Sequence, residues 1–161
     1  MLTLSAQKID APEPPVFDTK TPTSKVRRVI LADIAEIGQW LVTRCKEIYP
    51  RTSERMLWAW INSCLNDRFC YMIRSDKAVG MVRLLREPME TDMIADEMFL
   101  FAMDGGMDDA ASLYPAFRKW CEVSRVAEWR LGQHSDLPMS VIKEIVGGKR
   151  TRTIHYVDFQ K

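Results

Sequence analysis

The sequence has few residues that could form a metal site or a disulfide framework. It contains only two histidines, His134 and His155, and its four cysteines share no C-x-x-C spacing. Because a zinc site needs closely spaced Cys or His ligands, we predict no metal site. Each cysteine lies in an apolar stretch, which favours reduced thiols in the core. The four are Cys45, Cys64, Cys70 and Cys121.

Long apolar runs and an excess of charge of either sign are also missing. No run approaches the roughly 20 residues that span a bilayer, and residues 1–20 lack the basic start and apolar block of a secretory signal. The 23 basic and 22 acidic side chains nearly cancel, so no overall field attracts nucleic acid or an anionic membrane. We therefore expect a cytoplasmic protein, or part of an assembly built in the cytoplasm, with protein partners.

The chain of 161 residues, 47% apolar and 28% charged, suits one globular domain with a tail. Residues 1–25 hold four of the eight prolines and cannot bury enough apolar surface to fold alone. We predict a flexible proline-rich arm there and a single domain over 26–161. The arm is either a disordered leader or an extended segment that docks on a neighbouring subunit, with Val16 and Phe17 as its apolar anchor.

Apolar periodicity predicts the first elements of the domain. Residues 26–31 indicate a strand, and the spacing of Asp33 and Glu36 suits a capping box for a helix that ends near residue 49. A second helix is expected from about Ser53 to Leu65. Trp58 falls off its apolar stripe, so this side chain either contacts a partner or packs against the first helix.

After the second helix, the spacing of apolar residues changes from the helical period to the two-residue period of strands. Residues 69–74 and 78–85 flank a short loop and predict a hairpin, and 93–103 predicts an apolar strand. The helix that follows either begins near Ser112 or kinks at Pro115. A strand at 128–131, a short helix capped by Ser135 and Asp136, and a last strand at 151–159 complete the order β-α-α-β-β-β-α-β-α-β.

The strand that ends at residue 103 runs into Asp104-Gly105-Gly106 and then the helix. Such a turn places backbone N–H groups and a helix N-terminus where α/β proteins hold phosphates. Three carboxylates, of Asp104, Asp108 and Asp109, occupy this turn, and no Lys or Arg lies within it. They would oppose a phosphate electrostatically.

The element order, the segment Ala78-Val79-Gly80-Met81 and the strand-glycine-helix unit together resemble the GNAT superfamily of acyl-CoA N-acyltransferases over residues 26–161. The resemblance implies an α/β (α+β) fold with a mixed, mostly antiparallel sheet flanked by helices. The chain also resembles the small GNAT-like proteins of tailed bacteriophages, some of which are virion components.

The resemblance implies that backbone amides of Asp104, Gly105, Gly106, Met107, Asp108 and Asp109 would hold the pyrophosphate of acetyl-CoA. Active members read Gln/Arg-x-x-Gly-x-Gly/Ala at this turn. Here the glycines are adjacent and the leading Gln or Arg is missing. We therefore expect the affinity for acetyl-CoA to be weakened or absent.

The resemblance also implies a general base at Glu97, which is otherwise a solvated carboxylate at a strand end. The last helix lacks the tyrosine that acts as the general acid in active members, so Tyr156 or Tyr114 would have to protonate the leaving thiolate. His134, on a loop, is either a base or simply exposed.

Two functions follow from these residues. The first is a GNAT-fold protein without a cofactor that serves binding or assembly, including assembly into a phage virion. The second is an acetyl-CoA-dependent N-acetyltransferase with a non-standard cofactor loop.

Overall fold

The computed structural model describes residues 26–86 and 92–147. The predicted arm (1–25), the segment 87–91 and the predicted last strand (151–159) lie outside these residues. The elements follow in the order β1 (Arg27–Arg28), α1 (Leu31–Ile48), α2 (Glu54–Asn66), β2 (Cys70–Arg74), β3 (Ala78–Arg86), β4 (Met93–Ala102), α3 (Met107–Val123), β5 (Glu128–Arg130) and α4 (Met139–Val146). This order agrees with the prediction as far as α4.

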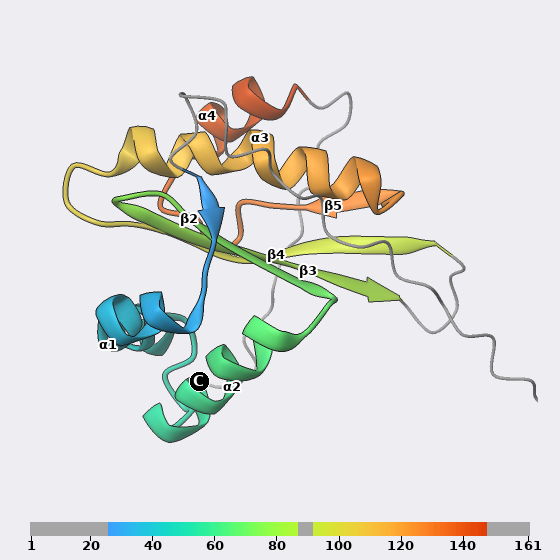
Figure 1. The fold of residues 1–161 in the computed structure, drawn as a ribbon. Coiled ribbons are helices and arrows are strands. Elements are labelled where there is room, and N and C mark those ends of the chain that lie inside the picture. Colours follow the sequence, from blue (N-terminus) through green and yellow to red (C-terminus); the bar gives the residue numbers. More distant parts are fainter. Residues whose placement is uncertain (1–25, 87–91, 148–161) are drawn as a thin grey trace, which may run out of the picture.

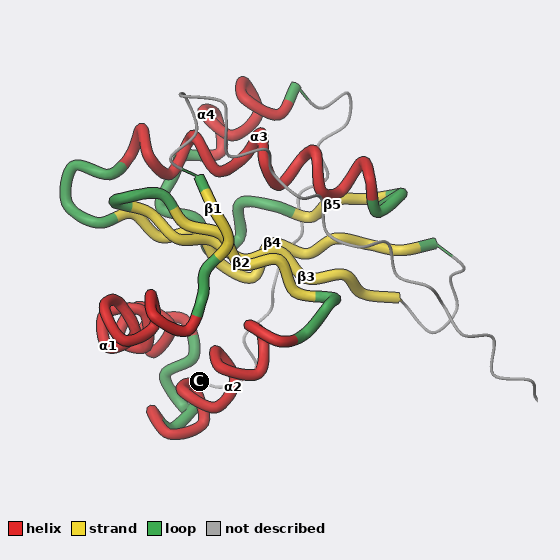
Figure 2. Tube along the Cα trace, in the orientation of Figure 1, coloured by secondary structure: helices red, strands yellow, loops and turns green. Residues whose placement is uncertain are grey.

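The five strands within the described residues form one sheet in the order β1-β2-β3-β4-β5 (Figure 2). Neighbouring strands are antiparallel except β4 and β5, which are parallel because α3 forms the crossover between them. The hairpin of β2 and β3 is confirmed, and its loop is closed by a 3.0 Å hydrogen bond from Ser75 N to Ala78 O. The predicted mixed, mostly antiparallel sheet flanked by helices is confirmed.

Helices cover both faces of the sheet (Figure 1). α1 and α2 lie on one face, whereas α3 and α4 lie on the other. In the apolar stripe predicted for the second helix, Leu57, Ile61 and Cys64 are buried in the core on the side of α1 and α2, whereas Met56 is 64% exposed. Phe117 and Trp120 of α3 are buried in the core on the other face of the sheet. The four cysteines are buried free thiols. Among the described residues, no helix is long and apolar enough to cross a membrane.

The start of the domain differs from the prediction. The first strand is confined to Arg27–Arg28, because α1 begins at Leu31. Asp33 therefore lies in the first turn of α1, where its carboxylate accepts a 2.9 Å hydrogen bond from Ile30 N. The predicted capping box of Asp33 with Glu36 is therefore wrong: Ile30 is the N-cap residue, and Asp33 is the third residue of the helix.

Two further helix starts also differ. α3 begins at Met107 and continues through Pro115, so a start near Ser112 is wrong. Proline removes one backbone donor, and the remaining hydrogen bonds and the buried apolar face maintain the helix. α4 begins at Met139 after Pro138, so Ser135 and Asp136 do not cap it.

A β-bulge in β4 changes which side chains face each core. Val82 pairs with Glu97 and Met81 pairs with Phe99, which leaves Met98 as the extra residue. Met98 and Phe99 consequently both pack in the core of α1 and α2. Glu97, just before the bulge, is directed toward α3, where Tyr114 interacts with its carboxyl group.

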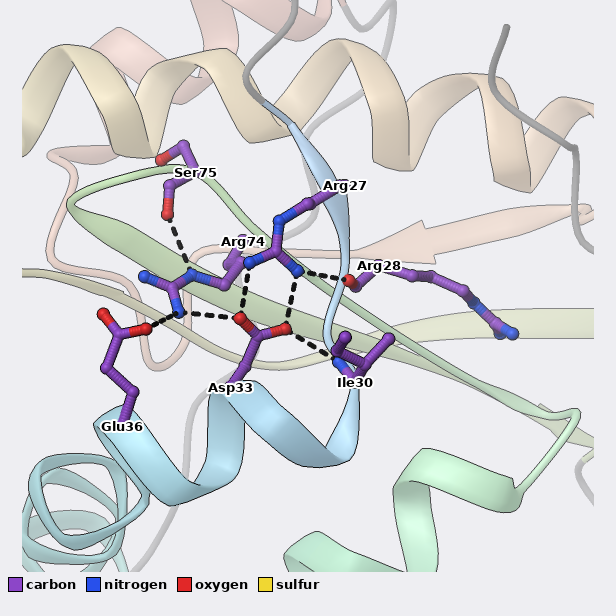
Figure 3. A network of polar contacts seen from close by, with 7 residues as sticks. All are labelled: Arg27, Arg28, Ile30, Asp33, Glu36, Arg74 and Ser75. Atoms are coloured by element: carbon purple, nitrogen blue, oxygen red, sulfur yellow. Dashed lines mark hydrogen bonds and ion pairs between the residues drawn. The ribbon is translucent and has the colours of Figure 1, made fainter. Parts of the chain in front are cut away.

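An ionic network centred on the buried Asp33 and Arg74 joins β1, the start of α1 and the end of β2 (Figure 3). Asp33 is 3% exposed, and its carboxylate accepts hydrogen bonds from the Arg27 guanidinium and, at 3.0 Å, from Arg74 Nη1. Arg74 also donates from Nε to Ser75 O at 3.2 Å and pairs with Glu36 at 3.4 Å. The hydrogen bonds from Arg27 hold the pKa of Asp33 down to about 2, although burial opposes this shift.

The depressed pKa gives the network a defined pH dependence. Folding favours the ionised Asp33, so its contribution to stability is complete above the ordinary pKa of 3.8 and is lost as the pH falls toward about 2. The network adds to the other contacts of the short strand β1, which are its ladder to β2 and the contacts of Arg28 with Cys70 O and the Tyr71 ring.

We predict that Asp33→Asn lowers the free energy of unfolding at pH 7 by about 2 to 4 kcal/mol, because it leaves the buried Arg74 without its main counter-charge. Urea denaturation measures the change. Glu36→Gln is the matched control: its carboxylate is 69% exposed, so the loss should stay below about 1 kcal/mol. Equal losses in the two variants would contradict this account of the network.

Candidate functional site

The turn after β4 is packed tightly against the hairpin loop between β2 and β3. Met103 N donates to Lys77 O, and Gly106 N donates to Met103 O, both at 2.8 Å. A Cβ atom on Gly106 would lie 2.3 Å from Lys77 O, so this position requires glycine. Gly105 has φ +69°, which also favours glycine. The two adjacent glycines are thus explained by the turn itself and its contact with the hairpin loop.

The predicted acidic turn is present, and the structure adds one cation to it. Asp104 and Asp108 are exposed, and the Asp109 carboxylate accepts a 2.7 Å hydrogen bond from Lys77 N. The Lys77 ammonium group lies 3.6 Å from the position of a Cβ on Gly105. Sequence reasoning missed Lys77 because it lies on another hairpin, where only the strand pairing brings it to the turn.

β4 and β5 separate after a short paired stretch, and the chain that follows β5 then returns to β4. They pair from Ile94 to Asp96, and the chain after β5 leaves the ladder before it returns at the Leu100–Ser135 bridge. Leu100 N donates to His134 O, and Asp136 N donates to Leu100 O, both at 2.9 Å. We call residues 132–136 the strap. The strap therefore occupies the edge of β4 just before the glycine turn.

Asp136 fixes the end of the strap. One carboxylate oxygen accepts a 2.8 Å hydrogen bond from Ala102 N, and the other pairs with the Arg44 guanidinium. Arg44 in turn lies over the Phe101 ring, 4.8 Å from its centroid. The predicted helix-capping role of Asp136 is replaced by this link between α1, β4 and the strap.

Glu97 lies in the gap where the two strands separate. It is 2% exposed, and its Oε1 accepts a 3.2 Å hydrogen bond from Gly132 N of the strap. Among the described residues, Oε2 has no hydrogen-bond partner. Burial raises the pKa of Glu97 to about 7, while Tyr114 and the Gly132 N–H lower it and Asp96 raises it further. The solvated strand-end interpretation of Glu97 is therefore wrong.

Tyr114 of α3 adjoins this carboxyl group. It is fully buried, its hydroxyl lies 3.1 Å from Ser135 Oγ, and burial raises its pKa above the ordinary value. Ser135 Oγ also accepts a hydrogen bond from Leu137 N at 3.1 Å. Tyr114 thus connects α3 to the strap beside Glu97.

A second group of titratable residues lies on the opposite face of β4. Side chains alternate along a strand, so Asp96 is directed away from Glu97, toward α1 and α2. Burial raises the pKa of Asp96, and Arg130 and His134 lower it. His134 is half-buried, with its ring 6.1 Å from that of Tyr49, and burial lowers its pKa. The interpretation of His134 as a simply exposed loop residue is therefore wrong.

The remaining predicted site residues are not brought to this region. Val16, Phe17 and Tyr156 lie outside the described residues. Trp58 packs across α1, with its ring 2.4 Å from the position of a Cβ on Gly38. The half-buried indole therefore has an intramolecular contact, and its partner contact stays a prediction.

Comparisons with known proteins identify the fold. The sequence matches no protein-family model and no curated protein. Solved structures match over most of the chain. A probable acetyltransferase aligns with TM-score 0.64 at 8% identity, covering 84% of this chain and 98% of its own. The ribosomal-protein-alanine N-acetyltransferase of Brucella melitensis biovar Abortus 2308 aligns with TM-score 0.56 at 13% identity, covering 83% and 99%.

The aminoglycoside 6'-N-acetyltransferase AAC(6')-Ih of Acinetobacter baumannii is similar to the same extent, with TM-score 0.56, 13% identity and coverage of 84% and 97%. The chain has the GNAT fold. At these identities the likeness concerns the fold alone.

We predict that Glu97→Gln stabilises the protein above pH 7. Folding raises the pKa of Glu97 from 4.5 to about 7, so the native state retains the proton longer and the free energy of unfolding falls as the pH rises between these values. At about 1.4 kcal/mol per pKa unit, the free energy of unfolding of the wild type falls by roughly 3 kcal/mol over this pH range. Denaturation from pH 4 to 8 should show the variant gaining on the wild type over this window. If the free energies of unfolding of the wild type and the variant changed with pH in the same way, the raised pKa of the buried Glu97 would be contradicted.

Proposed function

We propose that this GNAT-fold protein is non-catalytic and serves binding or assembly, with its acetyl-CoA site lost. The observation that carries the proposal is the occupation of the β4 edge by the chain's own strap.

The route of a cofactor along the sheet supports this proposal. An acyl-CoA held by its diphosphate at residues 104–109, with its acyl group at Glu97, would have to extend along β4 from Ala102 at least to Glu97, which is roughly 17 Å at about 3.4 Å per residue. On that edge, Leu100 N and O and Ala102 N are already hydrogen-bonded to the strap. A cofactor would have to break these bonds and the Asp136–Arg44 pair before it could bind.

The charge of the turn supports the same conclusion. Within the described residues, the cation that the structure brings to the turn of Asp104, Asp108 and Asp109 is Lys77, whose ammonium group lies near Gly105. Two like charges 4 to 6 Å apart repel by roughly 1 to a few kcal/mol at a surface-like dielectric constant. A diphosphate would therefore gain little at this turn despite the helix N-terminus.

The burial of the candidate catalytic groups is the third argument. Glu97 is 2% exposed and Tyr114 fully buried. A general base must come within hydrogen-bond distance of the proton that it removes. With the strap in place, an acceptor amine has no such access to Glu97.

Exposed apolar side chains favour a role in protein contacts. Ile30, Leu31 and Met56, at the starts of α1 and α2, are 56%, 71% and 64% exposed. Together with the proline-rich arm and its Val16–Phe17 anchor, they suit self-association or a larger assembly, such as a phage virion.

A second candidate function is an acetyl-CoA-dependent N-acetyltransferase acting on an amine of a protein or a small molecule. The observation that favours it is the raised pKa of Glu97, about 7, since a general base works best near the operating pH. In that case Glu97 would accept the amine proton, and Tyr114 or Tyr156 would protonate the thiolate. The strap would have to open for this chemistry.

The thermal shift with acetyl-CoA separates the two functions. A ligand at 100 times its dissociation constant stabilises the native state by about 2.7 kcal/mol. We expect no shift at millimolar acetyl-CoA, with coenzyme A and buffer as controls. A clear shift with acetyl-CoA would refute the loss of the cofactor site and support the enzyme.

Truncation tests the assembly role of the arm. If residues 1–25 dock on a neighbouring subunit, their removal should reduce the mass of the particle measured by light scattering. Substitution of Val16 and Phe17 by Ser in the full chain should have the same effect, whereas Lys8→Ser should have none. A full-length protein that is monomeric at all concentrations would exclude docking between copies.

A further inference from the structure

We propose that the strap, residues 132–136, is a pH-dependent latch on the β4 edge, closed when Glu97 is neutral and loosened when Glu97 is ionised. The proposal goes beyond the non-catalytic function and requires no cofactor. It rests on how the strap is attached, on the environment of Glu97, and on the sharing of one hydroxyl proton.

The strap is attached at two ends by different chemistry. At its start, Gly132 N donates to Glu97 Oε1 at 3.2 Å. At its end, Asp136 accepts from Ala102 N and pairs with Arg44. Between them, the ladder consists of the single Leu100–Ser135 bridge, and the strap residues are half-buried or exposed. Such a segment has little apolar burial and can open locally without unfolding the sheet.

Among the residues that the structure describes, the groups that act on Glu97 provide no counter-charge. Tyr114 faces it from α3, the Gly132 N–H faces it from the strap, and Asp96 adjoins it on β4. On β3 the residue opposite is Val82, and on β5 the charged residue Arg130 stands opposite Asp96 in the ladder. Ionised Glu97 would be a buried carboxylate whose Oε2 lacks a hydrogen-bond donor among the described residues. Opening the strap admits water to this oxygen, so ionisation favours the open state.

Tyr114 couples the carboxyl group to the middle of the strap. Its hydroxyl has one proton, which it can donate to Ser135 Oγ, 3.1 Å away, or to Glu97. A neutral Glu97 leaves this proton for Ser135, whereas a carboxylate competes for it. Ionisation therefore weakens the Ser135 contact. It strengthens the hydrogen bond from Gly132 N, but burial acts on Glu97 more strongly than its hydrogen bonds do, so the net effect favours opening, while the Asp136 end stays in place.

Amide hydrogen exchange of the full chain, resolved by NMR, tests the latch. The reporters are the Leu100, Ala102 and Asp136 amides. The controls are the Cys70 amide, which donates to Asp67 O in the turn before β2, and the Leu84 amide, which donates to Phe69 O. Wild type and Glu97→Gln are compared at the same pH, so intrinsic exchange cancels. At pH 8 the reporters should exchange about tenfold faster in the wild type, since one pKa unit of coupling is a factor of ten, and at pH 5 the two should agree.

A second variant separates opening from misfolding. Asp136→Ala removes the other attachment and should speed exchange of the reporters at both pH values, without affecting Cys70 or Leu84. Equal reporter rates in wild type and Glu97→Gln at pH 8 would overturn the latch. A reporter difference that depends on urea as steeply as the exchange of Cys70 and Leu84 would also overturn it, because it would reflect global unfolding rather than local opening. Neither result depends on whether acetyl-CoA binds.

Discussion

The backbone of Leu100 is the point on which the structure of the site depends. A strand that loses its parallel neighbour leaves N–H and C=O groups that must find other partners, since an unpaired buried peptide group costs about as much as a lost hydrogen bond. In this chain the strap supplies both partners, from His134 O and Asp136 N. The strap thereby fills the gap between β4 and β5. The same hydrogen bonds that complete the sheet occupy the backbone groups of β4 that an extended ligand would need.

Two buried carboxyl groups show how the surroundings decide the protonation state. Asp33 and Glu97 are 3% and 2% exposed. Asp33 receives hydrogen bonds from two guanidinium groups, and its pKa falls to about 2. Glu97 has one N–H, one tyrosine and a neighbouring carboxylate, so burial dominates and its pKa rises to about 7. The first group links β1 and α1 to β2, whereas the second lies where β4 and β5 separate.

The fold could be predicted because it depends on periodicity, which is local. The hairpin around residues 75–77, the boundaries of α2 and the strand before the glycine turn follow from apolar spacing and turn residues. The bulge at Met98 could not be predicted, because an extra residue in an apolar run leaves no mark on the pattern. Pro115 suggested a helix boundary, but tertiary packing of Leu113 and Phe117 keeps α3 continuous.

The site was predictable only in part. Glu97 and the acidic turn were identified from their positions in the strand-glycine-helix unit. Lys77, Arg44 and Asp136 were not, because each reaches the site through a contact between segments distant in sequence. Asp136 was misleading, since Ser135-Asp136 before an apolar run is also typical of a helix cap.

The central claim is that the chain itself occupies the β4 edge. A crystal structure of the protein grown in the presence of millimolar acetyl-CoA at pH 7 tests it most directly. The account predicts that His134 and Asp136 remain hydrogen-bonded to Leu100, with no cofactor density along β4. Density for acetyl-CoA against the amides of residues 104–109, with the strap displaced from Leu100, would contradict it.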